Sequence, residues 1–197
     1  PPAPADAAVR EESPLPDNQE PLVFIGKDKE FTGMEAMIMF KTDPLPREMR
    51  NTMAYIALDF VQDAISGMLN ERLKEITRQA DAPFSGAGVG FGEFLVAKTK
   101  EALSLDISMK ENRYAEGIKA AYRELLRASR GGFTESEYDR FKQEYLSQID
   151  AAYEARDKRT NTSFVNAYVG HFVDNIPAAG IEWGHQMMNQ LVPTPPL

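Results

Sequence analysis

Glycine at every second position of one short stretch constrains the fold more than any other feature of the sequence. The four residues are Gly86, Gly88, Gly90 and Gly92. Side chains alternate between the two faces of a strand, so these glycines are predicted to share one face. A strand that is bare on one face lets a helix, a peptide or a bend of the sheet approach its backbone closely.

The opposite face of this strand is predicted to be apolar. Phe84, Val89, Phe91 and, further along, Leu95 are assigned to it, whereas Ala87 is out of phase. The candidate ribbon therefore consists of Phe84 together with the four glycines, Gly86, Gly88, Gly90 and Gly92. Two roles are open for it, lining a bound substrate or packing closely against another element.

The remaining elements follow from hydrophobic periodicity. Strands are predicted at 22–25, 35–41 and 99–109, a long helix at 48–79, and further helices starting near Asn112, Thr134, Thr160 and Ile181. In the strand 99–109, the odd-numbered Leu103, Leu105, Ile107 and Met109 are expected to face inward, and Ala102, Ser104, Asp106 and Ser108 outward. This order favours an α+β fold, an antiparallel sheet covered by several helices on one side.

Composition restricts the classes of function. The chain has 197 residues, a formal net charge of −8 and no cysteine. The acidic balance argues against a nucleic-acid surface, and no apolar run is long enough for a membrane span. Residues 1–21 are predicted to be an extended proline-rich linker, 22–191 a single α+β domain, and 192–197 the start of another linker. We therefore expect a part of a longer polypeptide.

No motif for catalysis, metal binding or cofactor binding is present. The glycines do not fit G-x-G-x-x-G, and no Gly-Lys-Ser/Thr follows them. Ser85 lacks the G-x-S-x-G elbow, and neither His171 nor His185 belongs to an H-E-x-x-H or H-x-x-E-H motif. A set of His171, Asp174, Glu182 and His185 has no recognised metal-ligand spacing. We predict no catalytic, metal or cofactor-binding residue in this chain.

Several stretches carry a resemblance to a known family. They are EPLVFIGKDKEFTGMEAMIMFKTDPLP, Leu-Asn-x-Arg-Leu at 69–73, Asp-Ala-Pro-Phe at 81–84, GGFTESEYDRFKQEYL and AAGIEWGHQMMNQLVPT. In this order and spacing they resemble the non-catalytic domain of the pitrilysin/insulinase family of zinc metallopeptidases, the inverzincins. That family includes bacterial zinc proteases and the mitochondrial processing peptidase.

The resemblance implies a parent protein that is a zinc-dependent metalloendopeptidase. Its zinc would lie in a separate catalytic domain that carries H-x-x-E-H, so no catalytic residue transfers to this chain. The expected partners are that catalytic domain, further homologous domains of the same polypeptide, and a peptide substrate held in a chamber whose wall this domain helps to form. A periplasmic or membrane-associated bacterial location is expected. The alternative is a stand-alone peptide-binding, protein-binding or structural module without a protease parent.

Overall fold

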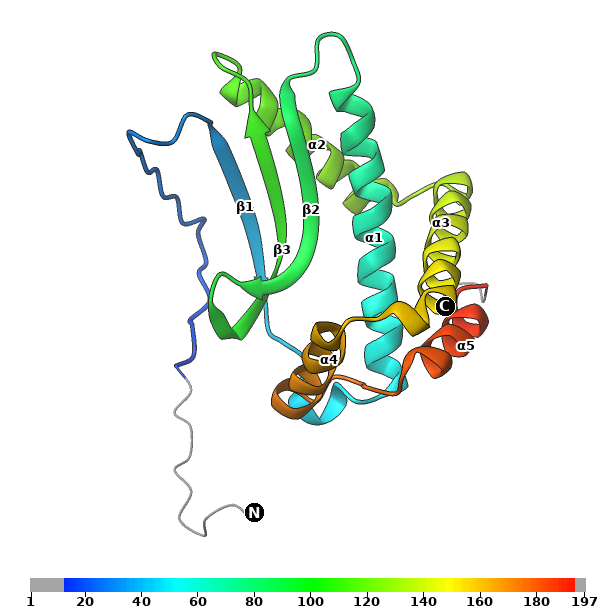
Figure 1. The fold of residues 1–197 in the computed structure, drawn as a ribbon. Coiled ribbons are helices and arrows are strands. Elements are labelled where there is room, and N and C mark those ends of the chain that lie inside the picture. Colours follow the sequence, from blue (N-terminus) through cyan, green and yellow to red (C-terminus); the bar gives the residue numbers. More distant parts are fainter. Residues whose placement is uncertain (1–12, 194–197) are drawn as a thin grey trace.

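The computed structural model describes residues 13–193, which form a three-stranded antiparallel sheet with helices on one side (Figure 1). The strands are β1 (Glu35–Thr42), β2 (Phe84–Phe94) and β3 (Ala97–Met109), in the order β1-β3-β2. The predicted α+β class is confirmed. The predicted strands 35–41 and 99–109 and the glycine strand are all present, and the last two pair as a hairpin.

The helices form a layer against the sheet and a second group beyond it. They are α1 (Met53–Thr77), α2 (Tyr114–Gly131), α3 (Glu135–Glu154), α4 (Asn161–Asp174) and α5 (Ile181–Leu191), with short 3-10 turns at Arg47–Met49 and Arg156–Lys158. Helices α1 and α2 contact the sheet, and α3 packs on α1 and carries α5. Helix α4 lies below them, near the lower end of the sheet (Figure 1).

The core lies between the sheet and helices α1 and α2. Leu69 and Leu73 of α1 are fully buried there against Leu105 and Ile107 of β3. The two leucines of α1 are four residues apart, as expected for one face of a helix, and Leu105 and Ile107 are two residues apart, as expected for one face of a strand.

A β-bulge sets the faces of β2. Phe84 pairs with Met109 but Gly86 pairs with Ser108, so Ser85 is one extra residue. The bulge brings Phe84 onto the core face together with Val89, which strict alternation would not do. Ala87 is in phase with Val89, contrary to the sequence-based assignment.

Leu95 was wrongly assigned to the apolar face of the strand. It lies in the turn that connects β2 with β3, has a φ of 56°, and is exposed. The turn ends the alternation one residue after Phe94, so the apolar face of β2 does not extend to Leu95.

The predicted strand 22–25 is wrong for the conformation in this structure, because these residues are irregular and almost fully exposed. Asn112 does not cap α2, since it has a φ of 61° and Arg113 occupies the N-cap position. Both errors come from local signals, an apolar run and a capping residue, whose tertiary partners sequence alone does not supply.

The N-terminal segment is irregular where it is described, but it contacts the sheet. Lys100 Nζ donates to Asp17 and Asp43 at 2.8 and 2.6 Å, and Lys41 Nζ donates to the Pro16 carbonyl at 2.9 Å. Ala102 was predicted to face outward. It lies near these contacts of the N-terminal segment and is only 1% exposed, so it is buried. Residues 1–12 and 194–197 of the two predicted linkers lie outside the described part of the chain.

Candidate functional site

The structure separates the residues of the candidate ribbon between two faces. Phe84 is fully buried in the core, whereas the glycines belong to the sheet face that points away from the helices. A Cβ at Gly90 or Gly92 would meet no described atom within 4 Å. Phe84 therefore packs closely, and the far half of the glycine face is open.

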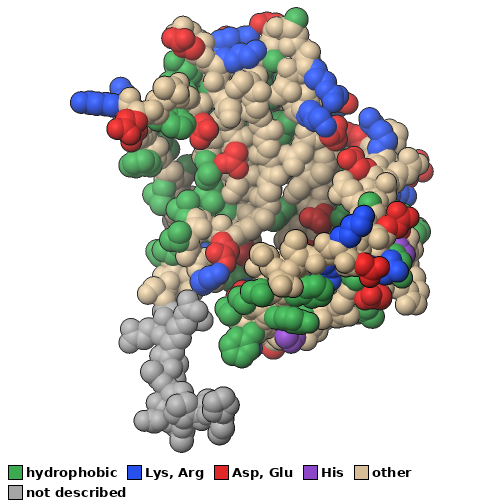
Figure 2. Space-filling view, viewed as in Figure 1, with side chains coloured by type: hydrophobic (Ala, Val, Ile, Leu, Met, Phe, Trp, Pro, Cys, Tyr) green, Lys and Arg blue, Asp and Glu red, His purple; other side chains and the backbone are tan. Residues whose placement is uncertain are grey.

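The neighbours of the glycines on β3 are small or acidic. Gly86, Gly88 and Gly90 pair with Ser108, Asp106 and Ser104. The outer face therefore carries few bulky groups along these two strands, and Figure 2 shows little hydrophobic side chain over the middle of the molecule in this view. Bulkier apolar groups begin on β1, where Met37 is more than half exposed.

Asn70 of α1 holds the edge of β2. Its Oδ1 accepts from the Val89 N–H at 2.7 Å, and its Nδ2 donates to the Val89 carbonyl at 3.1 Å. A side-chain amide thus occupies the two backbone groups that a further strand would use at this position. The Asn of the Leu-Asn-x-Arg-Leu motif therefore fastens the long helix to the glycine strand.

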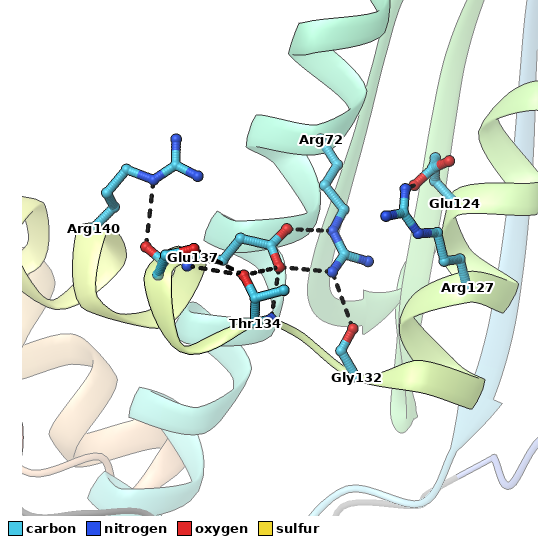
Figure 3. A network of polar contacts seen from close by, with 8 residues as sticks. Arg72, Glu124, Arg127, Gly132, Thr134, Glu137 and Arg140 are labelled. Atoms are coloured by element: carbon cyan, nitrogen blue, oxygen red, sulfur yellow. Dashed lines mark hydrogen bonds and ion pairs between the residues drawn. The ribbon is translucent and has the colours of Figure 1, made fainter.

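Arg72 of the same motif joins α1 to the start of α3 (Figure 3). Its Nε and Nη2 form a two-pronged ion pair with the Glu137 carboxylate at 2.5 and 2.9 Å, and Nη2 also donates to the Gly132 carbonyl at 3.0 Å. The guanidinium lies over the Phe133 ring at 4.6 Å. Arg72 is only 9% exposed, and the ion pair with Glu137 makes the burial of its charge tolerable, although Nη1 has no hydrogen-bond partner among the described residues.

Glu137 takes part in two interactions, the ion pair with Arg72 and the capping box of α3. It completes the capping box of α3, in which Thr134 accepts from the Glu137 N–H and the Glu137 carboxylate accepts from the Thr134 N–H at 2.7 Å. Hydrogen bonds from Arg72, then those from Thr134, lower the pKa of Glu137 to about 2 against the opposing effect of burial. The predicted helix start at Thr134 is confirmed, and its role in holding α1 is an additional finding.

The Asp-Ala-Pro-Phe stretch has an equally structural role. Asp81 accepts from Arg113 at 2.6 Å, while Ala82 and Phe84 are fully buried. A Cβ at Gly117 of α2 would lie 3.1 Å from the Pro83 carbonyl oxygen, a tight contact that glycine avoids. The motif fixes the distance between the start of β2 and α2.

A cavity of about 490 Å³ between α1 and α3 contains titratable groups that sequence reasoning missed. Asp63 and Tyr145 both line it. Burial raises the pKa of Asp63 and of the neighbouring Asp59, and burial beside Asp63 raises the pKa of Tyr145 to about 12. The signal available in the sequence was the pair of acids one helical turn apart within an apolar stripe.

The two histidines lie in separate environments. His171 Nδ1 is 2.8 Å from the Ile176 carbonyl, and His185 Nε2 is 2.8 Å from Asp150 while its ring stacks on Tyr153. Within the described chain, no group of three or more His, Asp or Glu side chains is arranged to hold a metal ion. Each histidine instead joins neighbouring parts of the helical layer.

Solved structures with the same fold come from bacterial proteases. The first half of the periplasmic protease PqqL from Escherichia coli aligns over 81% of this chain and 33% of its own, with a TM-score of 0.67 and 16% identity. A predicted insulinase family protease from Yersinia pestis aligns over 83% of this chain and 34% of its own, with a TM-score of 0.65 and 13% identity. The chain therefore shares its fold with domains of these bacterial proteases.

The sequence identifies the family. The family described as "Peptidase M16 inactive domain" matches residues 2–145, and the chain belongs to it. The relative described as "Zinc protease PQQL-like" from Arabidopsis thaliana is 25% identical over 180 residues, which cover 91% of this chain and 15% of the relative. The resemblance stated from the sequence is confirmed. The chain therefore spans only a small part of the length of this relative. No helix among residues 13–193 is long and apolar enough to cross a membrane.

Proposed function

We propose that this chain is a non-catalytic domain of a zinc-dependent metalloendopeptidase and that the open glycine face of its sheet lines the chamber that holds the peptide substrate. The observation that carries the proposal is the empty space over Gly90 and Gly92. An extended peptide needs a surface without bulky side chains, and alternate glycines on an edge strand provide one.

The catalytic zinc belongs, in this proposal, to another domain of the same polypeptide, which is also the partner of this domain. Membership in a family of inactive peptidase domains and the short coverage of the longer relative support that arrangement. The periplasmic origin of the similar protease PqqL supports a periplasmic parent. The peptide would meet backbone and small polar groups here and would react elsewhere.

The isolated chain provides the first test. Metal content and peptide hydrolysis are measured with and without added zinc, and the expected result is no stoichiometric zinc and no cleavage. Zinc-dependent cleavage that is lost on replacing His171 or His185 would overturn the proposal. A stable complex with a protein other than a protease domain would support a stand-alone module instead.

The chamber wall is tested in the complete polypeptide with Gly90→Leu. The new side chain enters open space on the sheet surface, so the fold and zinc content should be retained. We expect KM for a long peptide to rise several-fold while kcat for a short peptide is unchanged. The matched control is Val96→Leu in the exposed β2–β3 turn, which should alter neither constant. Equal KM values for the two variants would remove the glycine face from the binding surface.

A further inference from the structure

A strap of residues 18–33 connects the N-terminal contacts with β1. It begins after Pro16 and Asp17, which are bonded to Lys41 and Lys100, and it finishes at Met34, whose carbonyl accepts from the Met109 N–H at 2.8 Å. The two anchors lie at opposite ends of β1. The strap therefore runs antiparallel to β1, along its outer side (Figure 1).

The edge of β1 that faces this strap has no partner strand among the described residues. The Met34–Met109 hydrogen bond fixes which backbone groups of β1 point toward β3. By alternation, the N–H and C=O groups of Met37, Met39 and Lys41 point the other way, toward the unpaired side. A free edge of this length is a template for another strand.

The strap carries a segment with the properties of such a strand. Residues 22–25, Leu-Val-Phe-Ile, are bounded by Pro21 and Gly26, and their side chains are 81–92% exposed. Figure 2 shows this hydrophobic group on the outer edge of the molecule. Apolar β-branched and aromatic residues in a short run favour a pleated, partly buried strand over an open coil.

The anchors also determine the alignment. Asp17 and Asp43 both accept from Lys100, and an antiparallel strand that places them opposite each other pairs residues 22–25 with residues 38–35, the first half of β1. Residues 26–33 then form the connecting loop, with Gly26 and Gly33 at its ends and a turn in which Asp28 accepts from the Glu30 N–H. The exposed Met37 lies on the stretch of β1 that such a strand would cover.

We propose that residues 22–25 close onto the free edge of β1 as a fourth, antiparallel strand, and that the structure represents the open form of this strap. The occupant of the edge is a segment of the same chain, held close to it by contacts at both ends. Closure satisfies the unpaired backbone of β1 and buries the most exposed apolar run of the described chain. The inference is independent of the proposed protease function.

Disulfide trapping tests closure directly, because the chain contains no cysteine. Met37→Cys is combined in turn with Leu22→Cys, Val23→Cys and Phe24→Cys, and the rate of intramolecular disulfide formation is measured. A closed strand places neighbouring positions on opposite faces, so the rate at 23 should differ from the rates at 22 and 24 by on the order of tenfold. The matched control combines Met37→Cys with Val96→Cys. Val96 is as exposed as Phe24 but lies in the turn between β2 and β3, away from the strap, so this pair should crosslink most slowly.

Equal rates at the three positions would show a strap without strand geometry and would overturn the proposal. Crosslinks that form only between chains, with a rate that depends on concentration, would assign the edge to a second copy and would overturn it as well.

Hydrogen exchange on the chain without cysteines gives an independent readout. Val23→Pro removes a donor from the strap and blocks a regular strand there. It should accelerate exchange of the Met37 and Met39 amides and leave that of Leu105, in the central strand, unchanged. Unchanged exchange at Met37 in this variant would contradict closure.

Discussion

The junction of α1 with α3 and the helix α4 differ in where their side chains find partners. At the junction, Arg72, Glu137 and Thr134 bond to one another, and Leu69 and Leu73 are fully buried next to them. In α4, Phe172 is 83% exposed and Tyr168 63% exposed. The side chains of the first region find their main partners within this chain, although the buried Arg72 Nη1 has no hydrogen-bond partner among the described residues, whereas the apolar surface of the second region is not covered by the described residues.

The attachment of α4 explains how such a helix is held without a core of its own. Arg47 donates to the carbonyls of Val173 and Phe172 at 3.3 and 3.1 Å, and Asn175 Nδ2 donates to the Arg47 carbonyl at 2.9 Å. The two bonds from Arg47 satisfy carbonyls in the last turn of the helix, and all three orient it through its C-terminus. Polar contacts at one end position α4, whereas apolar packing along a whole face positions α1.

The largest expected effect comes from breaking the junction. Arg72→Ala leaves the Glu137 carboxylate without its cation and should lower the free energy of unfolding by about 3–5 kcal/mol. Urea unfolding followed by circular dichroism measures the change. Lys74→Ala, which removes a surface pair with Glu71, is the control and should cost less than about 1 kcal/mol. Equal losses for the two variants would contradict the distinction between a completed junction and an ordinary surface.

Gly67 tests how tightly α1 and α3 pack. An added Cβ would lie 2.7 and 2.8 Å from two atoms of the Phe141 ring, which is itself packed against Phe60 and Tyr145. Overpacking of about 1–3 kcal/mol exceeds the helix-propensity gain of about 1 kcal/mol, so Gly67→Ala should be destabilising.

Gly184→Ala in α5 is the matched control for Gly67→Ala, because no described atom lies near its added Cβ. It should be stabilising by up to about 1 kcal/mol. The thermal midpoint should fall for Gly67→Ala and rise for Gly184→Ala. A higher midpoint for Gly67→Ala would indicate that α1 and α3 pack less tightly than the structure shows.

Acid should weaken the junction selectively. Because the pKa of Glu137 is about 2 in the folded chain and near 4.5 when unfolded, its stabilising contribution is present above pH 4.5 and is lost as the pH falls toward 2. After allowance for solvent screening, the loss should be about 1–2 kcal/mol. The raised pKa of Asp59 and Asp63 acts in the opposite direction, since those groups favour the folded state more at low pH.

Urea midpoints between pH 7 and pH 2 measure the acid effect, with Glu137→Gln as the comparison. The variant cannot ionise but retains a capping residue, so its curve should be flatter between pH 4.5 and 2. Parallel curves would mean that another carboxyl dominates.

The smallest effect is expected on α4. Phe172→Ser replaces an exposed ring and should change the free energy of unfolding by less than about 0.5 kcal/mol. Calorimetry of the isolated chain measures it, with Leu73→Ala at about 2–5 kcal/mol as the buried counterpart. A large loss for Phe172→Ser would show that α4 is packed in solution and would remove the contrast between the two regions.

The sequence predicted those parts of the fold whose signal lies within one element. The stripe of α1, the alternation of β3 and the capping box at Thr134 each have a local period or spacing, and all three are present. The bulge at Ser85 and the pairing of Arg72 with Glu137 depend on residues far apart in the chain, so no local pattern reveals them. The candidate ribbon was placed correctly as a strand, but its division between a buried Phe84 and open glycines required the register with β3.

Because Asn70 is hydrogen-bonded to Val89, the two edges of the sheet differ in their capacity to pair with a further strand. One margin already carries an amide in place of a further strand, while the β1 margin remains able to pair. If the strap stays open and two copies join through β1, both remaining edges of the joined sheet carry the Asn70 amide at Val89. Such an association favours a symmetric pair over growth into a fibre.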